Sequence, residues 1–318
     1  MTKPSFPSEK FVKEMAAMAR KHPALGRGLE TFCRFLQEIR TRHVFVALAE
    51  HAEKAPDIFF EQLERMIKNA TSAGDPAGWP LHFVPDVYGR SAHLLHDIRE
   101  DEAFTSQARE AVESKNSQLH YDRLFTLYEA MRSVSQRFQN ESLNAIEVGV
   151  YRGGTSHYIC SVLQKLHGNL SRFYCVDTFE GHSGQDLPEG NEGSHSPSMF
   201  SDTSFEHVKA SLGEFPFAEV LKARIQDVTE KMADRTFHFI HLDVDIFEPT
   251  LFALDFFIPR LAVGGIVCVD DYNKKTCPGI RSAIERVMLE RPGELMGFNT
   301  QTAQFLAVKL PPRSGNKS

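Results

Sequence analysis

Four aspartates follow two short apolar segments of the chain and could act together. Asp243 and Asp245 end the segment FHFIHLDVD, and Asp270 and Asp271 end the segment GIVCVDD. If the two segments are neighbouring parallel strands, which lie about 4.8 Å apart, the four carboxylates converge at one edge of a sheet. Carboxylates that close repel one another unless a positive charge intervenes. The pattern therefore predicts a cation at this edge.

The aspartates offer only oxygen atoms as ligands, and no Cys or His stands at metal-ligand spacing beside them. Hard cations prefer such ligands, so the cluster predicts Mg²⁺ before Mn²⁺ or Ca²⁺. The alternative is that each residue has a local role. Asp245 could cap a helix that begins near Glu248 and Pro249, and Asp271 could lie in a turn. Because four such coincidences would be needed, we favour the cation site.

The segment EVGVYRGG predicts a ligand-binding turn between a strand and a helix. Gly149, Gly153 and Gly154 let a ligand approach the backbone, and the start of the helix offers free N–H groups. The dinucleotide pattern GxGxxG would need a glycine where Tyr151 stands, which disfavours NAD. A plain tight turn is the alternative. Glu147 could be an ordinary strand carboxylate or could meet the positive end of a ligand.

Asp177 closes the next apolar segment, FYCVDTFEG. An acidic residue there can accept both hydroxyl groups of a ribose, although it could equally cap the following turn. Together with the glycine-rich turn it predicts a cofactor that contains adenosine but needs no pyrophosphate, and S-adenosylmethionine fits. The candidate cofactor-binding residues are Glu147, Gly149, Gly153, Gly154, Thr155, Ser156, Asp177, Thr178 and Asp227.

From Asn144 onward, short apolar segments alternate with helical segments, as in a parallel sheet with crossover helices. Ligands bind beyond the carboxyl ends of the strands in such sheets, which is where the residues above would gather. The last two strands are close enough in sequence to form an antiparallel hairpin. The predicted strands are AIEVG (145–149), RFYCVD (172–177), KARIQ (222–226), FHFIHLD (237–243), GIVCVD (265–270), ELMGF (294–298) and QFLAVKL (304–310).

The remaining segments are a helical region and a long loop. Residues 1 to about 135 show apolar residues at spacings of three and four, typical of helices. The stretch after Asp177, up to residue 203, is rich in Gly, Ser and Pro, and a loop of that length predicts a functional lid over about 181–203 or a disordered excursion. His182 and His195 in this loop are secondary candidates for a base.

Composition excludes several classes of function. The chain has 318 residues and a formal net charge of -6, which disfavours a nucleic-acid partner. No apolar run approaches the ~18 residues of a membrane span, and the first residues lack the apolar core of a secretory leader, so we expect a cytoplasmic protein. The five cysteines show no CxxC pairing, so we expect them to be reduced and structural.

Several of these segments resemble a known family. Four segments, in this order along the chain, are similar to the macrocin and mycinamicin type of O-methyltransferase: AIEVGVYRGGTS, YCVDTFEG, HLDVDIFEPTLFALDFFIPRLAVGGIVCVDDYN and PGIRSAIERV. That family is a metal-dependent branch of the class I S-adenosylmethionine methyltransferases. The resemblance covers roughly residues 120–310. The first 115 residues are longer than the usual helical lead-in of the family.

The resemblance implies an α/β fold of the class I methyltransferase type, Rossmann-like, with strand order 3-2-1-4-5-7-6 and an antiparallel last strand. The corresponding domains are a helical region at 1–115, an S-adenosylmethionine-binding domain at 116–311 and a disordered tail at 312–318. By the same resemblance Asp243, Asp270 and Asp271 are the metal ligands and Asp245 is the catalytic base. Val244 stands where the family often has glycine, which affects the shape of the acceptor pocket.

These features predict an S-adenosylmethionine-dependent and Mg²⁺-dependent O-methyltransferase, with Mn²⁺ as an alternative ion. The predicted acceptor is a small molecule, namely a vicinal diol on a sugar or another natural product. We expect a homo-oligomer. Three alternatives stay open: a nicotinamide-dependent oxidoreductase, a methyltransferase-like adaptor without catalysis, and a methyltransferase that modifies nitrogen or a protein side chain without a metal.

Overall fold

The computed structural model describes residues 101–312, apart from positions 115, 169, 188–191 and 301–302. The chain divides into two compact units, Met1–Asp97 and Ile98–Ser318. Every described residue belongs to the second unit. The helices predicted before residue 101 and the tail predicted beyond residue 312 lie outside the described residues.

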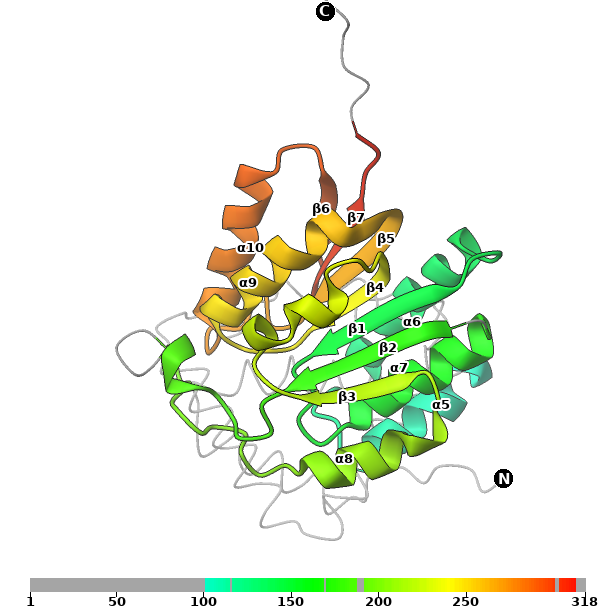
Figure 1. The fold of residues 1–318 in the computed structure, drawn as a ribbon, viewed down its shortest axis with the longest axis horizontal. Helices are drawn as coiled ribbons and strands as arrows, with labels where there is room; N and C mark the ends of the chain where they lie inside the picture. The colour runs from blue at the N-terminus through cyan, green and yellow to red at the C-terminus, as the bar shows by residue number, and fades with distance from the viewer. Residues whose placement is uncertain (1–100, 115, 169, 188–191, 301–302, 313–318) are drawn as a thin grey trace, which may run out of the picture. The chain divides into compact units, whose positions relative to one another are not determined.

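Seven strands form one mixed sheet: β1 (Leu143–Val148), β2 (Leu170–Asp177), β3 (Ala218–Lys222), β4 (Phe237–Leu242), β5 (Leu261–Val269), β6 (Leu295–Asn299) and β7 (Phe305–Lys309). Their order is β3-β2-β1-β4-β5-β7-β6 (Figure 1). β1 to β5 pair in parallel, whereas β7 runs antiparallel to both β5 and β6. The predicted strand order and the closing hairpin are confirmed.

The third strand lies earlier in the chain than predicted. We expected it at 222–226, but β3 pairs with β2 from Phe173 opposite Ala218 to Asp177 opposite Lys222. Ile225–Asp227 instead form a short 3-10 helix. Register is set by the pairing of one strand with its neighbour, and the local apolar pattern of a short edge strand specifies it only weakly.

Helices cover both faces of the sheet (Figure 1). They are α5 (Glu102–Glu113), α6 (Tyr121–Arg137), α7 (Gly154–Leu166), α8 (Phe205–Ser211), α9 (Phe247–Phe257) and α10 (Pro278–Glu290), with 3-10 helices η5 (Gly184–Asp186), η7 (Leu212–Glu214), η8 (Ile225–Asp227), η9 (Thr229–Met232) and η10 (Ile258–Arg260). On β4, Phe239 packs with the core of α5 to α8, and Ile240 packs with the core of α9 and α10. This alternation explains why the central strands bury side chains on both of their faces.

Helix α5 belongs to the same core as the sheet. Phe104 and Ala108 are fully buried, and the Phe104 ring lies 5.1 Å from the Phe125 ring of α6, measured between centroids. Asp101 caps the helix by accepting a hydrogen bond from the Phe104 amide at 3.0 Å. Helix α5 thus packs within the compact unit that begins at Ile98, together with the sheet.

The described residues bear on two expectations, one about membrane-spanning helices and one about the cysteines. None of the described helices is long and apolar enough to cross a membrane. Cys160, Cys175, Cys268 and Cys277 are free thiols and are buried, as predicted for structural cysteines. Cys33 lies outside the described residues.

Candidate active site

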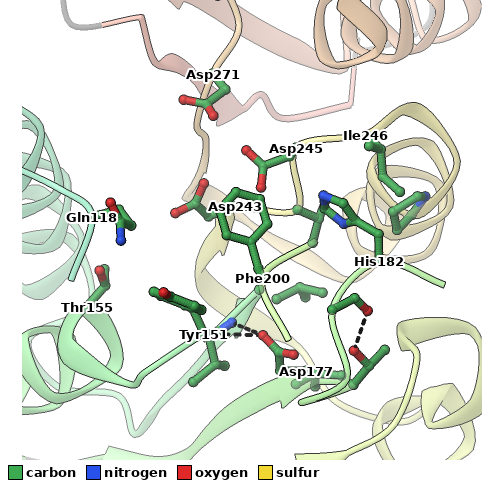
Figure 2. A pocket seen from close by; sticks show the side chains of 18 of the residues that line it. Gln118, Tyr151, Thr155, Asp177, His182, Phe200, Asp243, Asp245, Ile246 and Asp271 are labelled. Carbon is green, nitrogen blue, oxygen red and sulfur yellow. Dashed lines mark hydrogen bonds between the residues drawn. The ribbon is translucent and has the colours of Figure 1, made fainter. Parts of the chain in front are cut away.

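A cavity of about 420 Å³ opens at the carboxyl ends of β1, β2 and β4 (Figure 2). Its size lies within the ~300–1,000 Å³ typical of small-molecule sites, and its place is where open α/β sheets bind ligands. Of the predicted site residues, these contribute to its lining: Gly149, Thr155, Asp177, Thr178, Asp243, Asp245 and Asp271. These do not: Glu147, Gly153, Gly154, Ser156, Asp227 and Asp270.

The turn after β1 lies directly against the end of β4. Gly149 has a φ of 89°, and a Cβ atom built there would lie 1.9 Å from the backbone oxygen of Asp243. Any side chain would therefore push the two strand ends apart. Gly153, with a φ of 82°, precedes the first residue of α7. The glycines thus bring the turn and the aspartates together at one edge of the sheet, and two of the three shape the turn without lining the cavity.

Asp177 fastens the same turn to the end of β2. Its Oδ2 accepts hydrogen bonds from the Val150 amide at 2.7 Å and the Tyr151 amide at 2.8 Å (Figure 2). Its Oδ1 accepts one from the Phe179 amide at 2.7 Å. A carboxylate has about four acceptor positions, so about one remains for a ligand. Both roles weighed from the sequence, capping and ligand binding, are compatible with this geometry.

Glu147 lies beneath the cavity in a buried network. It accepts a short hydrogen bond from the Ser156 hydroxyl, and its Oε1 lies 2.8 Å from His241 Nδ1. His241 Nε2 lies 3.7 Å from Asp270 Oδ2. Burial acts to lower the pKa of His241, but Asp270 and Glu147 outweigh it and raise that pKa to about 10. These protein partners explain why Glu147 and Ser156 do not line the cavity.

Two cations, which the sequence did not predict, contact the acidic cluster. Arg123 Nη1 from α6 lies 2.8 Å from Asp271 Oδ1 and 3.4 Å from Asp270 Oδ2. Lys274 Nζ lies 2.7 Å from Asp271 Oδ1. Lys274 follows Asp271 by three residues and could have been suspected from VDDYNKK. Arg123 carries no such local signal, because the fold brings it to Asp270 across 147 residues of chain.

Nearby cations neutralise the negative charges of Asp243 and Asp245 less than that of Asp271. Within the described part of the chain, the Asp243 carboxylate forms no hydrogen bond or ion pair. Burial, followed by the charges of Asp270 and Asp271, raises the pKa of Asp243. Burial and the charge of Asp243 likewise raise the pKa of Asp245. The cluster therefore holds negative charge that the protein neutralises only in part, and Figure 2 shows Asp243, Asp245 and Asp271 facing one another.

Asp245 is not a helix cap. The residue before α9 is Ile246, and its side chain makes no capping hydrogen bond. The Phe247 amide at the start of that helix donates instead to Glu192, at 2.9 and 3.1 Å from its two carboxylate oxygens. Asp245 has a φ of 63° and Asp271 a φ of 65°. Left-handed backbone is uncommon outside glycine and gathers at functional sites, so it supports a role for both carboxylates in the cavity.

Among the described residues, a few sets of three side chains bring their metal-binding atoms within 4.8 Å of one another. The set of Asp243, Asp270 and Asp271, expected from the resemblance, is not among those found. Two sets meet the condition: His182, His195 and Asp245; and Asp245, Asp271 and Cys277. The sequence indicates His182 and His195 only as candidate bases and Cys277 only as a structural residue, so it does not predict either set.

The loop between β2 and α8 contributes to the cavity through His182 and Phe200 (Figure 2). The two rings lie 5.4 Å apart, measured between centroids. His182 Nε2 also lies 3.0 Å from His195 Nδ1. Burial and the neighbouring His195 lower the pKa of His182 to about 4. His182 is thus a neutral imidazole near neutral pH.

We expect the imidazole of His182 to titrate with a midpoint of about 4 rather than the ordinary value of 6.5. Because the unfolded chain takes up this proton first, stability should be fully present above about pH 6.5 and should fall as the pH drops to about 4. An NMR titration of the labelled side chain, assigned with His182→Gln, measures the midpoint. A midpoint near 6.5 would show that the ring is not buried beside His195.

The family model for Macrocin-O-methyltransferase (TylF) matches residues 86–291, which is more than half of the chain. A curated relative, the 8-demethyl-8-(2,3-dimethoxy-alpha-L-rhamnosyl)-tetracenomycin-C 4'-O-methyltransferase of Streptomyces olivaceus, is 30% identical over 146 residues. These residues are 42% of this chain and 54% of that protein, so the chain spans about half the length of the relative it matches.

A solved structure, that of the O-methyltransferase NovP, is also similar. The TM-score is 0.51 at 19% sequence identity, and the match covers 62% of this chain and 83% of that one. At this identity the similarity supports the fold alone. The family match extends over both the glycine turn and the four aspartates, and on that basis this chain belongs to the macrocin O-methyltransferase family.

Proposed function

We propose that this protein transfers the methyl group of S-adenosylmethionine to a hydroxyl group of a small natural-product acceptor, with Mg²⁺ at the acidic cluster. Membership of the family supports the reaction class. The relative from Streptomyces olivaceus is named for 4'-O-methylation of a rhamnosyl-tetracenomycin, and we take a sugar with vicinal hydroxyl groups as the acceptor class for that reason. The observation that carries the proposal is the pair of cavity carboxylates, Asp243 and Asp245, beside the Gly149 turn.

The residues around the cavity fit S-adenosylmethionine. Asp177 keeps about one acceptor position for a ribose hydroxyl. Thr178 and Gln226 add a hydroxyl and an amide to the lining. Asp227, which we expected at the cofactor, is exposed and does not contribute to the lining. Tyr151 stands where the dinucleotide pattern GxGxxG needs its second glycine, so the same residues remain unsuited to NAD.

The acidic cluster has the donor chemistry of a hard divalent cation site, although Asp243, Asp270 and Asp271 are not among the described sets whose ligand atoms all lie within 4.8 Å of one another. Asp270 Oδ1 is buried without a hydrogen-bond partner in the described residues, and Asp243 is unpaired there as well. An all-oxygen donor set of this charge suits Mg²⁺ or Mn²⁺. Asp243, Asp270 and Asp271 would hold the ion. Arg123 and Lys274 already balance part of the charge on Asp271, so we expect binding of moderate strength.

The roles of the residues follow from these positions. Bound S-adenosylmethionine would supply an electrophilic methyl group, and bound Mg²⁺ would lower the pKa of a neighbouring hydroxyl group. Asp245 is assigned to accept the proton of that hydroxyl, because its carboxylate lines the cavity beside Asp243 and Asp271. Glu192 ties the loop of His182 to the start of α9, because its carboxylate accepts the hydrogen bond of the Phe247 amide.

Calorimetric titration and a transfer assay test this proposal together. We expect one molecule of S-adenosylmethionine to bind per chain and NADH not to bind. A labelled methyl group should then appear on a rhamnosylated acceptor when Mg²⁺ is present and should not appear when a chelator is present. Binding of NADH in place of S-adenosylmethionine would contradict the reaction class. Transfer at an equal rate in the presence of chelator would contradict only the metal.

A further inference from the structure

His182 and His195 form a pair of nitrogen atoms at the wall of the cavity. His182 lines the cavity, and His195 is buried behind it. The distance from His182 Nε2 to His195 Nδ1 is 3.0 Å. Two nitrogens bound to one tetrahedral Zn²⁺ at about 2.0–2.1 Å would lie about 3.3 Å apart. The pair is therefore within a few tenths of an ångström of the spacing that a shared metal ion requires.

Asp245 completes a set of three. One of its carboxylate oxygens, His182 and His195 offer ligand atoms that all lie within 4.8 Å of one another. The three residues come from separate elements, because the histidines belong to the loop after β2 and Asp245 follows β4. Burial acts to lower the pKa of both imidazoles, which keeps them neutral and able to bind a metal.

The second nitrogen of His195 also has a partner. His195 Nε2 lies 3.3 Å from Cys277 Sγ, which in turn lies 3.5 Å from Asp271 Oδ2. Histidines that bind metals almost always have a hydrogen-bonding partner on the other ring nitrogen, which fixes the ring orientation. Cys277 fills that role for His195, so the thiol supports the pair without being one of the three ligands.

We propose that His182, His195 and Asp245 form a binding site for Zn²⁺ or a similar borderline divalent cation. Two imidazole nitrogens and one carboxylate suit such ions, whereas Mg²⁺ prefers the oxygen-only cluster. Three protein ligands leave a position open, as in zinc sites that bind a further ligand. His182 and Asp245 both line the cavity, so that position is accessible from it.

The site has a consequence that rests on the proposed function. Asp245 is there assigned as the base, and a carboxylate bound to Zn²⁺ cannot accept a proton from the acceptor. Zn²⁺ should therefore inhibit methyl transfer measured in Mg²⁺. Binding itself does not depend on the reaction, so the two proposals can fail separately.

Calorimetric titration of the chelator-treated protein with Zn²⁺, in excess Mg²⁺, tests the site. We expect one Zn²⁺ per chain. His182→Gln, His195→Gln and Asp245→Asn should each weaken binding by at least about 100-fold, since each removes a ligand, and Cys277→Ala by about 10-fold, since it removes a supporting contact. His207→Gln is the matched control, because His207 is exposed on α8 outside the site, and it should bind as the wild type does. Circular dichroism confirms that each variant is folded.

Substitution with Co²⁺ gives a second readout. The proposed ligands predict visible d–d absorption without the intense near-ultraviolet band of a cobalt–thiolate bond. A thiolate band, or wild-type affinity in both histidine variants, would overturn the assignment in favour of Asp245, Asp271 and Cys277. Failure of the wild-type protein to bind Zn²⁺ would overturn it outright. A protein that methylates its acceptor but binds no Zn²⁺ refutes this site alone, and one that binds Zn²⁺ but methylates nothing refutes the proposed function alone.

Discussion

Replacing Asp245 with Asn should lower kcat for methyl transfer by about 10²–10⁴-fold, the usual contribution of a positioned general base. The amide has nearly the same shape but cannot accept the proton of the acceptor hydroxyl. Binding of S-adenosylmethionine should persist, because the residues assigned to it lie on the turn after β1 and at the end of β2. Steady-state kinetics with saturating cofactor and Mg²⁺, together with a cofactor titration, measure both quantities.

Two further variants separate the role of Asp245 from a general effect of charge. Asp255→Asn removes a carboxylate on α9 that pairs with Arg291 away from the cavity, and its kcat should match that of the wild type. Asp243→Asn should weaken Mg²⁺ binding, whereas Asp245→Asn should largely retain it. If Asp245→Asn turns over at the wild-type rate, another group accepts the proton, and the assignment of Asp245 as the base is wrong.

Replacing His241 with Leu should lower the free energy of unfolding by about 3–5 kcal/mol, the cost typical of breaking a buried ion pair by removing one partner. His241 is fully buried, and it lies between Glu147 at 2.8 Å and Asp270 at 3.7 Å. Leucine fills a similar volume but removes the positive charge between the two carboxylates, which leaves Glu147 with its hydrogen bond from Ser156 and Asp270 with Arg123. Denaturant unfolding at pH 7 measures the loss.

The pKa of His241 also predicts how this contribution depends on pH. The value in the folded protein is raised to about 10 from an ordinary 6.5. Protonation therefore favours the folded state, so the contribution should be fully present below about pH 6.5 and lost as the pH rises through about 10. In the variant, this part of the pH dependence should be missing.

A neighbouring histidine provides the control. His238 is also buried on β4, but its Nδ1 accepts a single hydrogen bond, from the Asn144 amide at 3.1 Å. His238→Leu should cost only about 1–3 kcal/mol, the price of one unsatisfied donor. Adding Glu147→Gln to His241→Leu should recover part of the stability, because it removes the buried carboxylate charge that has lost its cation. A loss below about 1 kcal/mol in His241→Leu would show that the network is not charged.

The sequence alone determined the elements whose pattern is local. Apolar segments of four to eight residues, separated by helical segments, indicated the parallel strands, because side chains buried on both faces of a sheet leave a continuous apolar run. The aspartates and Asp177 were assigned to strand ends, and strand ends of a parallel sheet meet at one edge. The resemblance supplied the strand order. The predicted position of β3 was wrong, because the register of a strand depends on the neighbouring strand and not on the segment itself.

Only the tertiary structure decided what surrounds those aspartates. Arg123 reaches Asp270 and Asp271 from α6, Glu192 reaches the start of α9 from the loop after β2, and His195 reaches Cys277 across 82 residues of chain. Such contacts have no period and no fixed spacing, because they depend on how whole elements pack. The sequence could therefore identify the carboxylates and the need for a compensating positive charge. Which groups compensate them, and which nitrogen atoms stand beside Asp245, followed from the packing of helices and loops around the sheet.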